Sequence, residues 1–103
     1  MRKIVSTYID PDMDGTALMY AYTEYLKNKN IDAYYYFEGN LKNEAKIVLD
    51  KFKINYTPIK KIEQNDKFIL VDTNGLRYTP NCIDESNVIE IIDHHEKEGW
   101  NNS

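Results

Sequence analysis

The sequence predicts a single α/β domain with a Rossmann-like arrangement, a mostly parallel sheet flanked by helices on both faces. Two observations lead to this class. Short apolar or β-rich segments alternate with segments of helical periodicity, and two of the apolar segments end in an aspartate. Apolar strands separated by helices are typical of parallel sheets that are covered on both faces. A length of 103 residues suits one small domain, residues 1–103.

The first half of the chain predicts a strand, a helix and a second strand. The β-rich run KIVSTYI predicts a strand over residues 3–9, and IDAYYYF predicts another over 31–37. Between them, residues 15–29 have the spacing of an amphipathic helix. Its expected apolar stripe consists of Ala17, Leu18, Ala21, Tyr22, Tyr25 and Leu26.

The second half predicts one more helix and two more strands. Residues 41–53 form the helix, with an expected stripe of Leu41, Ala45, Val48, Leu49 and Phe52. KFILVD predicts a strand over 67–72, and NVIEIID predicts the last strand over 87–93. Each of these two strands is apolar and ends in an acidic residue, which is the pattern of a buried strand that leads into a functional loop.

Composition limits the classes of function. The net charge of −4 provides no global attraction for nucleic acid, although it is compatible with bound divalent cations. No apolar run approaches the roughly 20 residues that a transmembrane helix needs, so no membrane partner is expected. The single Cys82 cannot form an internal disulfide and fits a reducing compartment, which favours a cytoplasmic location.

Acidic residues and histidines follow three of the predicted strands. Asp10, Asp12 and Asp14 come after the first strand, Asp72 ends the third, and the last strand leads into Asp93, His94 and His95. In open parallel sheets, ligands bind where the carboxyl ends of the strands meet. A helix that begins near Gly15 would add the positive end of its dipole there. These side chains are therefore expected at one edge of the sheet.

Some of these residues also have purely structural interpretations. Asp14 precedes Gly15-Thr16-Ala17 and could serve only as a helix N-cap. Asp72 precedes Thr73-Asn74-Gly75 and could simply begin a turn. Adjacent histidines after a buried strand have no comparable structural explanation, so His94 and His95 point to function.

Two other kinds of site begin with a string similar to DPDMDG. Asp10, Asp12, Asp14 and Gly15 match the start of a calcium-binding EF-hand loop, but the twelfth position, which requires glutamate, is Ala21. Residues 12–16, DMDGT, resemble the opening signature of haloacid-dehalogenase-type phosphatases, in which Asp12 would be the nucleophile. That family also needs a late acidic pair at a strand end, and here the last strand is followed by His94 and His95.

Three motifs taken in order resemble the DHH phosphoesterase superfamily. They are DPDMDG at residues 10–15, VDTN at 71–74 and DHH at 93–95. The superfamily includes family II inorganic pyrophosphatases, RecJ-like exonucleases, oligoribonucleases and cyclic-dinucleotide phosphodiesterases. The resemblance implies a manganese-dependent phosphohydrolase that uses two metal ions, for which magnesium or cobalt could substitute, to hydrolyse a phosphodiester or phosphoanhydride.

The resemblance also implies a role for each residue. Asp12 would bind one metal ion, Asp14 and His94 the other, and Asp72 would bridge the two. His95 would contact the substrate phosphate, so Asp72 and His95 are the expected catalytic residues. Carboxylates combined with imidazole suit manganese better than calcium. The remaining acids of the motifs, Asp10 and Asp93, are expected to bind metal directly or to support the ligands from behind.

The sequence departs from the pyrophosphatase branch of the superfamily at three positions. Tyr8 stands where that branch has a metal-binding histidine, Asp10 where it has asparagine, and Gly15 where it has serine. The resulting DxDxDG form resembles the RecJ-like branch more closely. This shifts the expected substrate from pyrophosphate towards a phosphodiester, and the expected partner is a phosphorylated small molecule, a nucleotide or a short oligonucleotide.

The expected domain organisation is that of a partial enzyme. Members of the superfamily have a further aspartate ligand on a later strand and then a separate substrate-binding domain, and residues 96–103 are too few to supply either. The chain is expected to be the N-terminal part of a DHH catalytic domain that lacks the C-terminal substrate-binding domain, and to be inactive alone. A catalytically silent module that binds metal or nucleotide is the alternative from a different class of function.

Overall fold

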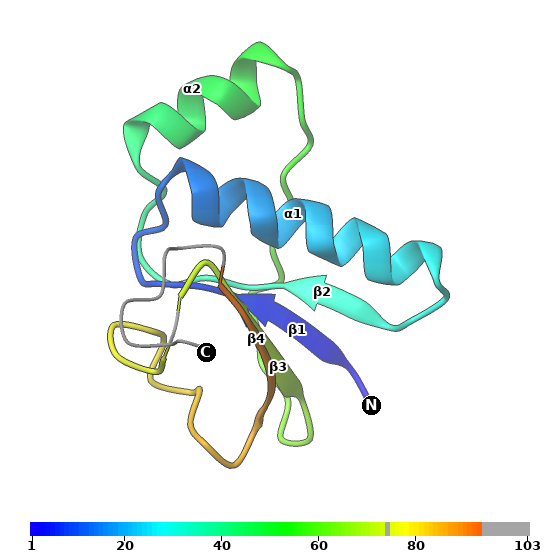
Figure 1. Ribbon diagram of the computed structural model, residues 1–103. Helices are drawn as coiled ribbons and strands as arrows, with labels where there is room; N and C mark the ends of the chain where they lie inside the picture. The colour runs from blue at the N-terminus through cyan, green and yellow to red at the C-terminus, as the bar shows by residue number, and fades with distance from the viewer. Residues whose placement is uncertain (74, 94–103) are drawn as a thin grey trace, which may run out of the picture.

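The computed structural model describes residues 1–73 and 75–93, and within them four strands form one parallel sheet. The strand order is β2-β1-β3-β4 (Figure 1). The elements are β1 (Lys3–Ser6), α1 (Met13–Asn28), β2 (Ala33–Tyr35), α2 (Asn43–Lys51), β3 (Lys67–Val71) and β4 (Val88–Ile92). The predicted α/β class and the parallel sheet are confirmed. No helix in the described part of the chain is long and apolar enough to cross a membrane.

Helix α1 packs on the sheet through a face that overlaps the predicted stripe only in part: Leu26 is buried, and Leu18 and Tyr22 pack half-buried against the core. Its buried residues are Gly15, Thr16, Met19, Thr23 and Leu26. Of the predicted stripe, Leu26 is buried, whereas Ala17, Ala21 and Tyr25 are exposed. The physical reason is size: glycine and threonine on the inner face let the helix approach the strands closely. Met19 and Leu26 are the fully buried apolar residues of α1, and Leu18, Tyr20 and Tyr22 pack partly buried against the same cluster.

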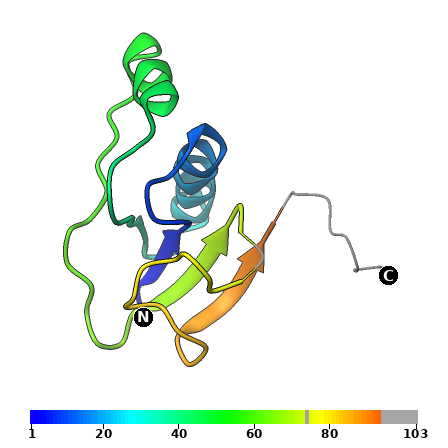
Figure 2. The same ribbon diagram turned by 90° about the vertical axis from the view of Figure 1, so that its left-hand side faces the viewer.

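The two faces of the sheet are covered in different ways. Helix α1 covers one face, where Val5, Ile69 and Val71 belong to its core cluster, and α2 packs on α1 on the same side (Figure 2). The opposite face carries a second cluster built on Ile4, Phe68, Leu70 and Ile83. Irregular segments cover this face, through residues that include Ile59, Ile62, Leu76 and Cys82. The sequence predicted helices on both faces, and in the described residues loops take the second face.

Strand order explains why a loop takes the second face. β2 lies on one side of β1 and β3 lies on the other. The connection from β2 to β3 therefore runs across the sheet in the direction opposite to the connection from β1 to β2. A right-handed crossover in the reverse direction must pass over the opposite face. Helix α2 ends at Lys51 before this passage, so the irregular segment that contains Pro58 makes it. Because α2 rests on α1, only Ala45 of its predicted stripe is buried, and Phe52 is 66% exposed.

An ion pair between Arg2 and Asp66 joins the start of β1 to the turn before β3. Arg2 donates from Nε to Asp66 Oδ1 (2.8 Å) and from Nη2 to Asp66 Oδ2 (2.7 Å). The amide of Glu63 also donates to Asp66 Oδ2 (2.8 Å). The guanidinium and this amide hold the pKa of the buried Asp66 carboxyl below its usual value. The free energy of unfolding therefore depends on pH through this ion pair.

We expect acid to destabilise the domain partly through Asp66. Because the pKa of Asp66 is lower in the folded state, its contribution is complete above about pH 4 and is lost as pH falls through the folded-state value. Asp66→Asn should cost roughly 1.5–3 kcal/mol at pH 7 and should lose less stability than wild type on acidification. Urea unfolding at pH 7 and pH 3 measures both effects. Asp50→Asn, at an exposed carboxylate of α2, is the matched control, and an Asp66→Asn protein as acid-sensitive as wild type contradicts the assignment.

Candidate functional site

The carboxyl ends of β1 and β3 lie side by side in the middle of the sheet. These two strands pair in parallel, with Ser6 opposite Leu70, so the residues after Ser6 and after Val71 leave the sheet at neighbouring points. From β1 the chain goes to one side to form β2 and later returns to form β3 on the other side. Such a reversal opens a crevice at the strand ends, which is where ligands bind in open α/β sheets.

The acidic loop after β1 is held in place by the segment after β2. Asp10 has φ +58°, its amide donates to the carbonyl of Glu38 (2.9 Å), and its Oδ1 accepts from the amide of Asn40 (2.8 Å). Gly39, at φ +85°, passes so close that an added Cβ would overlap Asp10 Oδ1. In the structure Asp10 therefore has a positioning role, and Gly39 leaves room for it.

Asp12 caps the N-terminus of α1. Its backbone is extended, and its Oδ1 accepts from the amide of Gly15 (2.9 Å), so the helix begins at Met13. The structural role that the sequence suggested for Asp14 thus belongs to Asp12. Asp14 lies exposed in the first turn, where the helix dipole favours a negative charge. Gly15 packs against the end of β1, since a Cβ there would lie 3.1 Å from Thr7 Oγ1.

Asp72 is the buried carboxylate of this edge. It directly follows β3, is 1% exposed, and has a left-handed backbone with φ +58°, like Asp10. Its amide donates to the carbonyl of Ile92 (2.8 Å), which ties the end of β3 to the end of β4, where half-buried Asp93 follows. Non-glycine residues in this conformation are uncommon and cluster at functional sites. Two such aspartates after neighbouring strands support a functional edge.

The metal-binding arrangement that the sequence predicts is not complete within the described residues. Across residues 1–73 and 75–93, no three carboxylate, imidazole or thiol groups are gathered closely enough to hold a metal ion. His94 and His95 lie outside the described residues. The convergence of Asp12, Asp14 and Asp72 with His94 stays a prediction, although these donor types suit manganese.

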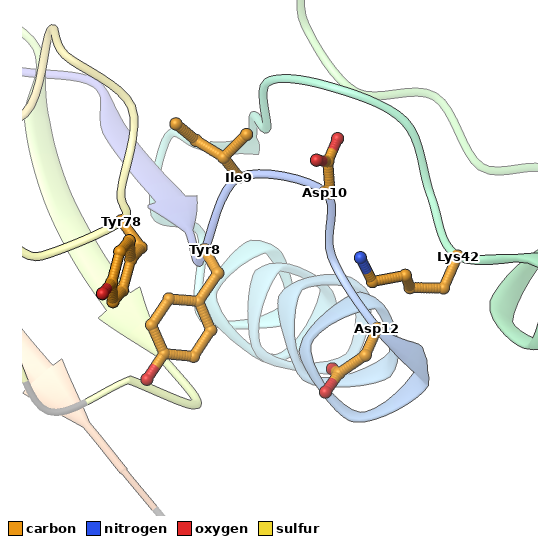
Figure 3. A pocket seen from close by; sticks show the side chains of 6 residues that line it. All are labelled: Tyr8, Ile9, Asp10, Asp12, Lys42 and Tyr78. Carbon is orange, nitrogen blue, oxygen red and sulfur yellow. The ribbon is translucent and has the colours of Figure 1, made fainter.

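A hollow of about 510 Å³ opens beside the acidic loop, and we call it the edge hollow. Its lining consists of Tyr8, Ile9, Asp10, Asp12, Lys42 and Tyr78 (Figure 3). The two tyrosines lie on one side of it, and the side chain of Lys42 extends into it from the other side (Figure 3). Sequence reasoning missed Ile9, Lys42 and Tyr78. The only signal for the last two was that each follows the carboxyl end of a predicted strand.

Fold and site together define a class: a parallel α/β domain with an acidic loop and a buried aspartate at its topological switch point. The chain belongs to the DHH family, because the model of the family's N-terminal domain matches residues 3–103. Similar proteins include probable manganese-dependent inorganic pyrophosphatases of Bacillus mycoides (strain KBAB4), Bacillus cereus (strain AH187) and Bacillus cytotoxicus. Each is 32% identical over 94 residues.

The match covers most of this chain but only a small part of each relative. It covers 89% of this chain but only 30% of each pyrophosphatase. The chain therefore spans less than a third of the length of the curated relatives it matches. The range matched by the family model, residues 3–103, contains the strand-end region described above, with the acidic loop, Asp72 and Asp93.

Proposed function

We propose that this chain is the N-terminal part of the catalytic domain of a manganese-dependent phosphohydrolase. One observation carries the proposal. A DHH-family domain places its acidic loop and the buried Asp72 at adjacent strand ends, on the crevice of the sheet. The relatives are described as manganese-dependent pyrophosphatases, which supports phosphoryl transfer to water with the same kind of ion.

The residues of the edge divide between holding cations and holding the protein in shape. We assign Asp12, Asp14, Asp72 and His94 as the residues that would hold two manganese ions. When bound, such ions neutralise phosphate charge and activate the attacking water. Asp10 and Asp93 would support the metal ligands without binding metal themselves. Asp10 fixes the loop, because its carboxylate accepts a hydrogen bond from the amide of Asn40. Asp12 has a double task, because its carboxylate also caps α1.

Two side chains of the protein, His95 and Lys42, are assigned to bind the phosphate of the substrate. We assign His95 to a contact with a phosphoryl oxygen, where negative charge grows during attack on phosphorus. Lys42 provides a second cation, since its side chain enters the edge hollow opposite the tyrosines (Figure 3). The reaction is hydrolysis of a phosphodiester or a phosphoanhydride: water adds to phosphorus, the bond to the leaving oxygen breaks, and a proton passes to the leaving group.

Phosphate release by the complete protein tests this function. The protein encoded by the whole reading frame is assayed with manganese against pyrophosphate, a short oligonucleotide and a cyclic dinucleotide. We expect hydrolysis of at least one of the three, and loss of hydrolysis when a chelator removes manganese. A folded protein that binds manganese but hydrolyses none of them contradicts the proposal.

That outcome would favour a different function, a metal- or nucleotide-binding module without turnover. One observation favours this second candidate: Asp10 and Asp12 of the acidic loop already accept hydrogen bonds from the amides of Asn40 and Gly15, which are structural contacts. Ligand binding without phosphate release distinguishes the module from the enzyme.

A further inference from the structure

Tyr78 presents an exposed ring at the rim of the edge hollow. The residue is 65% exposed, has φ +68°, and its carbonyl accepts from the amide of Ile9 (2.8 Å) in the loop after β1. The guanidinium of Arg77 lies 5.0 Å from the centre of the ring. A left-handed backbone costs a bulky residue of order 1–3 kcal/mol, and an exposed ring returns none of this through burial. The conformation instead keeps the ring beside the acidic loop.

The backbone of Lys42 is hydrogen-bonded to the acidic loop after β1, on the side of the hollow opposite Tyr78 (Figure 3). Its amide donates to the carbonyl of Pro11 (2.9 Å), so its backbone is fixed next to Asp12. The ion pairs formed among the described residues involve Arg2 and Lys27 and do not include Lys42. Its ammonium group thus supplies positive charge to the hollow without an ion pair within 4.0 Å among the described residues.

The lining of the hollow combines three kinds of chemistry. Asp10 and Asp12 of the acidic loop supply negative charge, Lys42 supplies positive charge, and Tyr8, Ile9 and Tyr78 supply aromatic and aliphatic surface (Figure 3). A volume of about 510 Å³ falls in the range of roughly 300–1,000 Å³ that small-molecule sites occupy. Pyrophosphate has no apolar part, so it would leave the two rings and the isoleucine without a contact.

We infer that the edge hollow is a subsite for a nucleoside monophosphate unit of the substrate. The base lies against Tyr78, Tyr8 and Ile9, and the phosphate lies towards Lys42 and the metal-binding carboxylates. The inference rests on the proposed function and narrows its substrate to a nucleotide or an oligonucleotide. Stacking on an aromatic side chain tolerates any base, because every base has a π-face. The subsite therefore selects for the presence of a base and not for its identity.

Titration of the 103-residue protein with two matched ligands tests the subsite. Adenosine 5′-monophosphate carries the base and ribose 5-phosphate does not, and binding of each is measured by calorimetry at millimolar manganese. We expect the base to improve affinity about tenfold, within the range measured for one stacked base. Tyr78→Ala should abolish this difference, Tyr78→Phe should keep it, and Lys42→Ala should weaken both ligands alike.

The control is Tyr25→Ala, which removes another exposed tyrosine ring, from α1 and outside the hollow. It should leave both affinities unchanged. Equal affinity for the two ligands, or binding of neither, overturns the subsite. The proposed function is judged separately by phosphate release: hydrolysis without any preference for a base defeats only the subsite, and base-dependent binding without hydrolysis defeats only the enzyme.

Discussion

Asp72→Asn should lower the manganese-dependent hydrolysis rate of the complete protein at least about 100-fold. Asparagine has nearly the same shape, so it can occupy a position that is 1% exposed without a cavity or a clash. What it lacks is the negative charge that would lie between two cations. Residues that merely support metal ligands cost 10–100-fold when mutated, and a bridging ligand should cost no less.

Two measurements keep this result from being confused with misfolding. Urea unfolding of Asp72→Asn should give a transition close to that of wild type, and Asp50→Asn should retain full activity because its carboxylate lies on α2. Rates are compared at saturating manganese, so that lost affinity is not mistaken for lost chemistry. A folded Asp72→Asn protein with more than a tenth of the wild-type rate would show that Asp72 only begins the turn after β3.

The periodicity of the sequence predicts the elements of this fold better than it predicts their packing. Apolar runs ending in acids correctly locate β3 and β4. β3 is buried as such a run predicts, whereas β4 is the edge strand of the sheet and leaves Ile89 and Ile91 exposed. The face of α1 could not be read in the same way. Hydrophobic patterns find large apolar side chains, and here close approach to the sheet selects Gly15, Thr16 and Thr23 for the inner face.

For the candidate site too, the sequence predicts the position of residues along the fold but not their tertiary contacts. Strand ends at one edge follow from the topology, so Asp10, Asp12 and Asp72 could be expected there from sequence. The left-handed backbones of Asp10 and Asp72 and the capping role of Asp12 depend on hydrogen bonds to distant segments, such as Asn40 and Ile92. Lys42 and Tyr78 enter the hollow because their loops are tied to Pro11 and Ile9. No local pattern encodes those tertiary contacts.

Asp12 variants should separate the structural role of this residue from its chemical one. Asparagine caps helices about as well as aspartate, so Asp12→Asn should keep the bond from the amide of Gly15 and melt close to wild type without metal. Asp12→Ala loses the cap and should be about 1 kcal/mol less stable. A metal ion that binds only the folded protein adds about 2.7 kcal/mol at a hundredfold excess over its Kd. Both variants should lose most of this manganese-dependent stabilisation.

Thermal unfolding with and without millimolar manganese measures the two effects in one experiment. Asp50→Asn should gain as much from manganese as wild type does, since it changes a similar charge outside the site. If Asp12→Asn gains the full stabilisation, Asp12 is a cap and not a ligand. The haloacid-dehalogenase alternative requires Asp12 to form a covalent phosphoaspartate. Direct attack of water on phosphorus leaves no such species, so a trapped phosphate on Asp12 would reject the DHH mechanism in favour of that alternative.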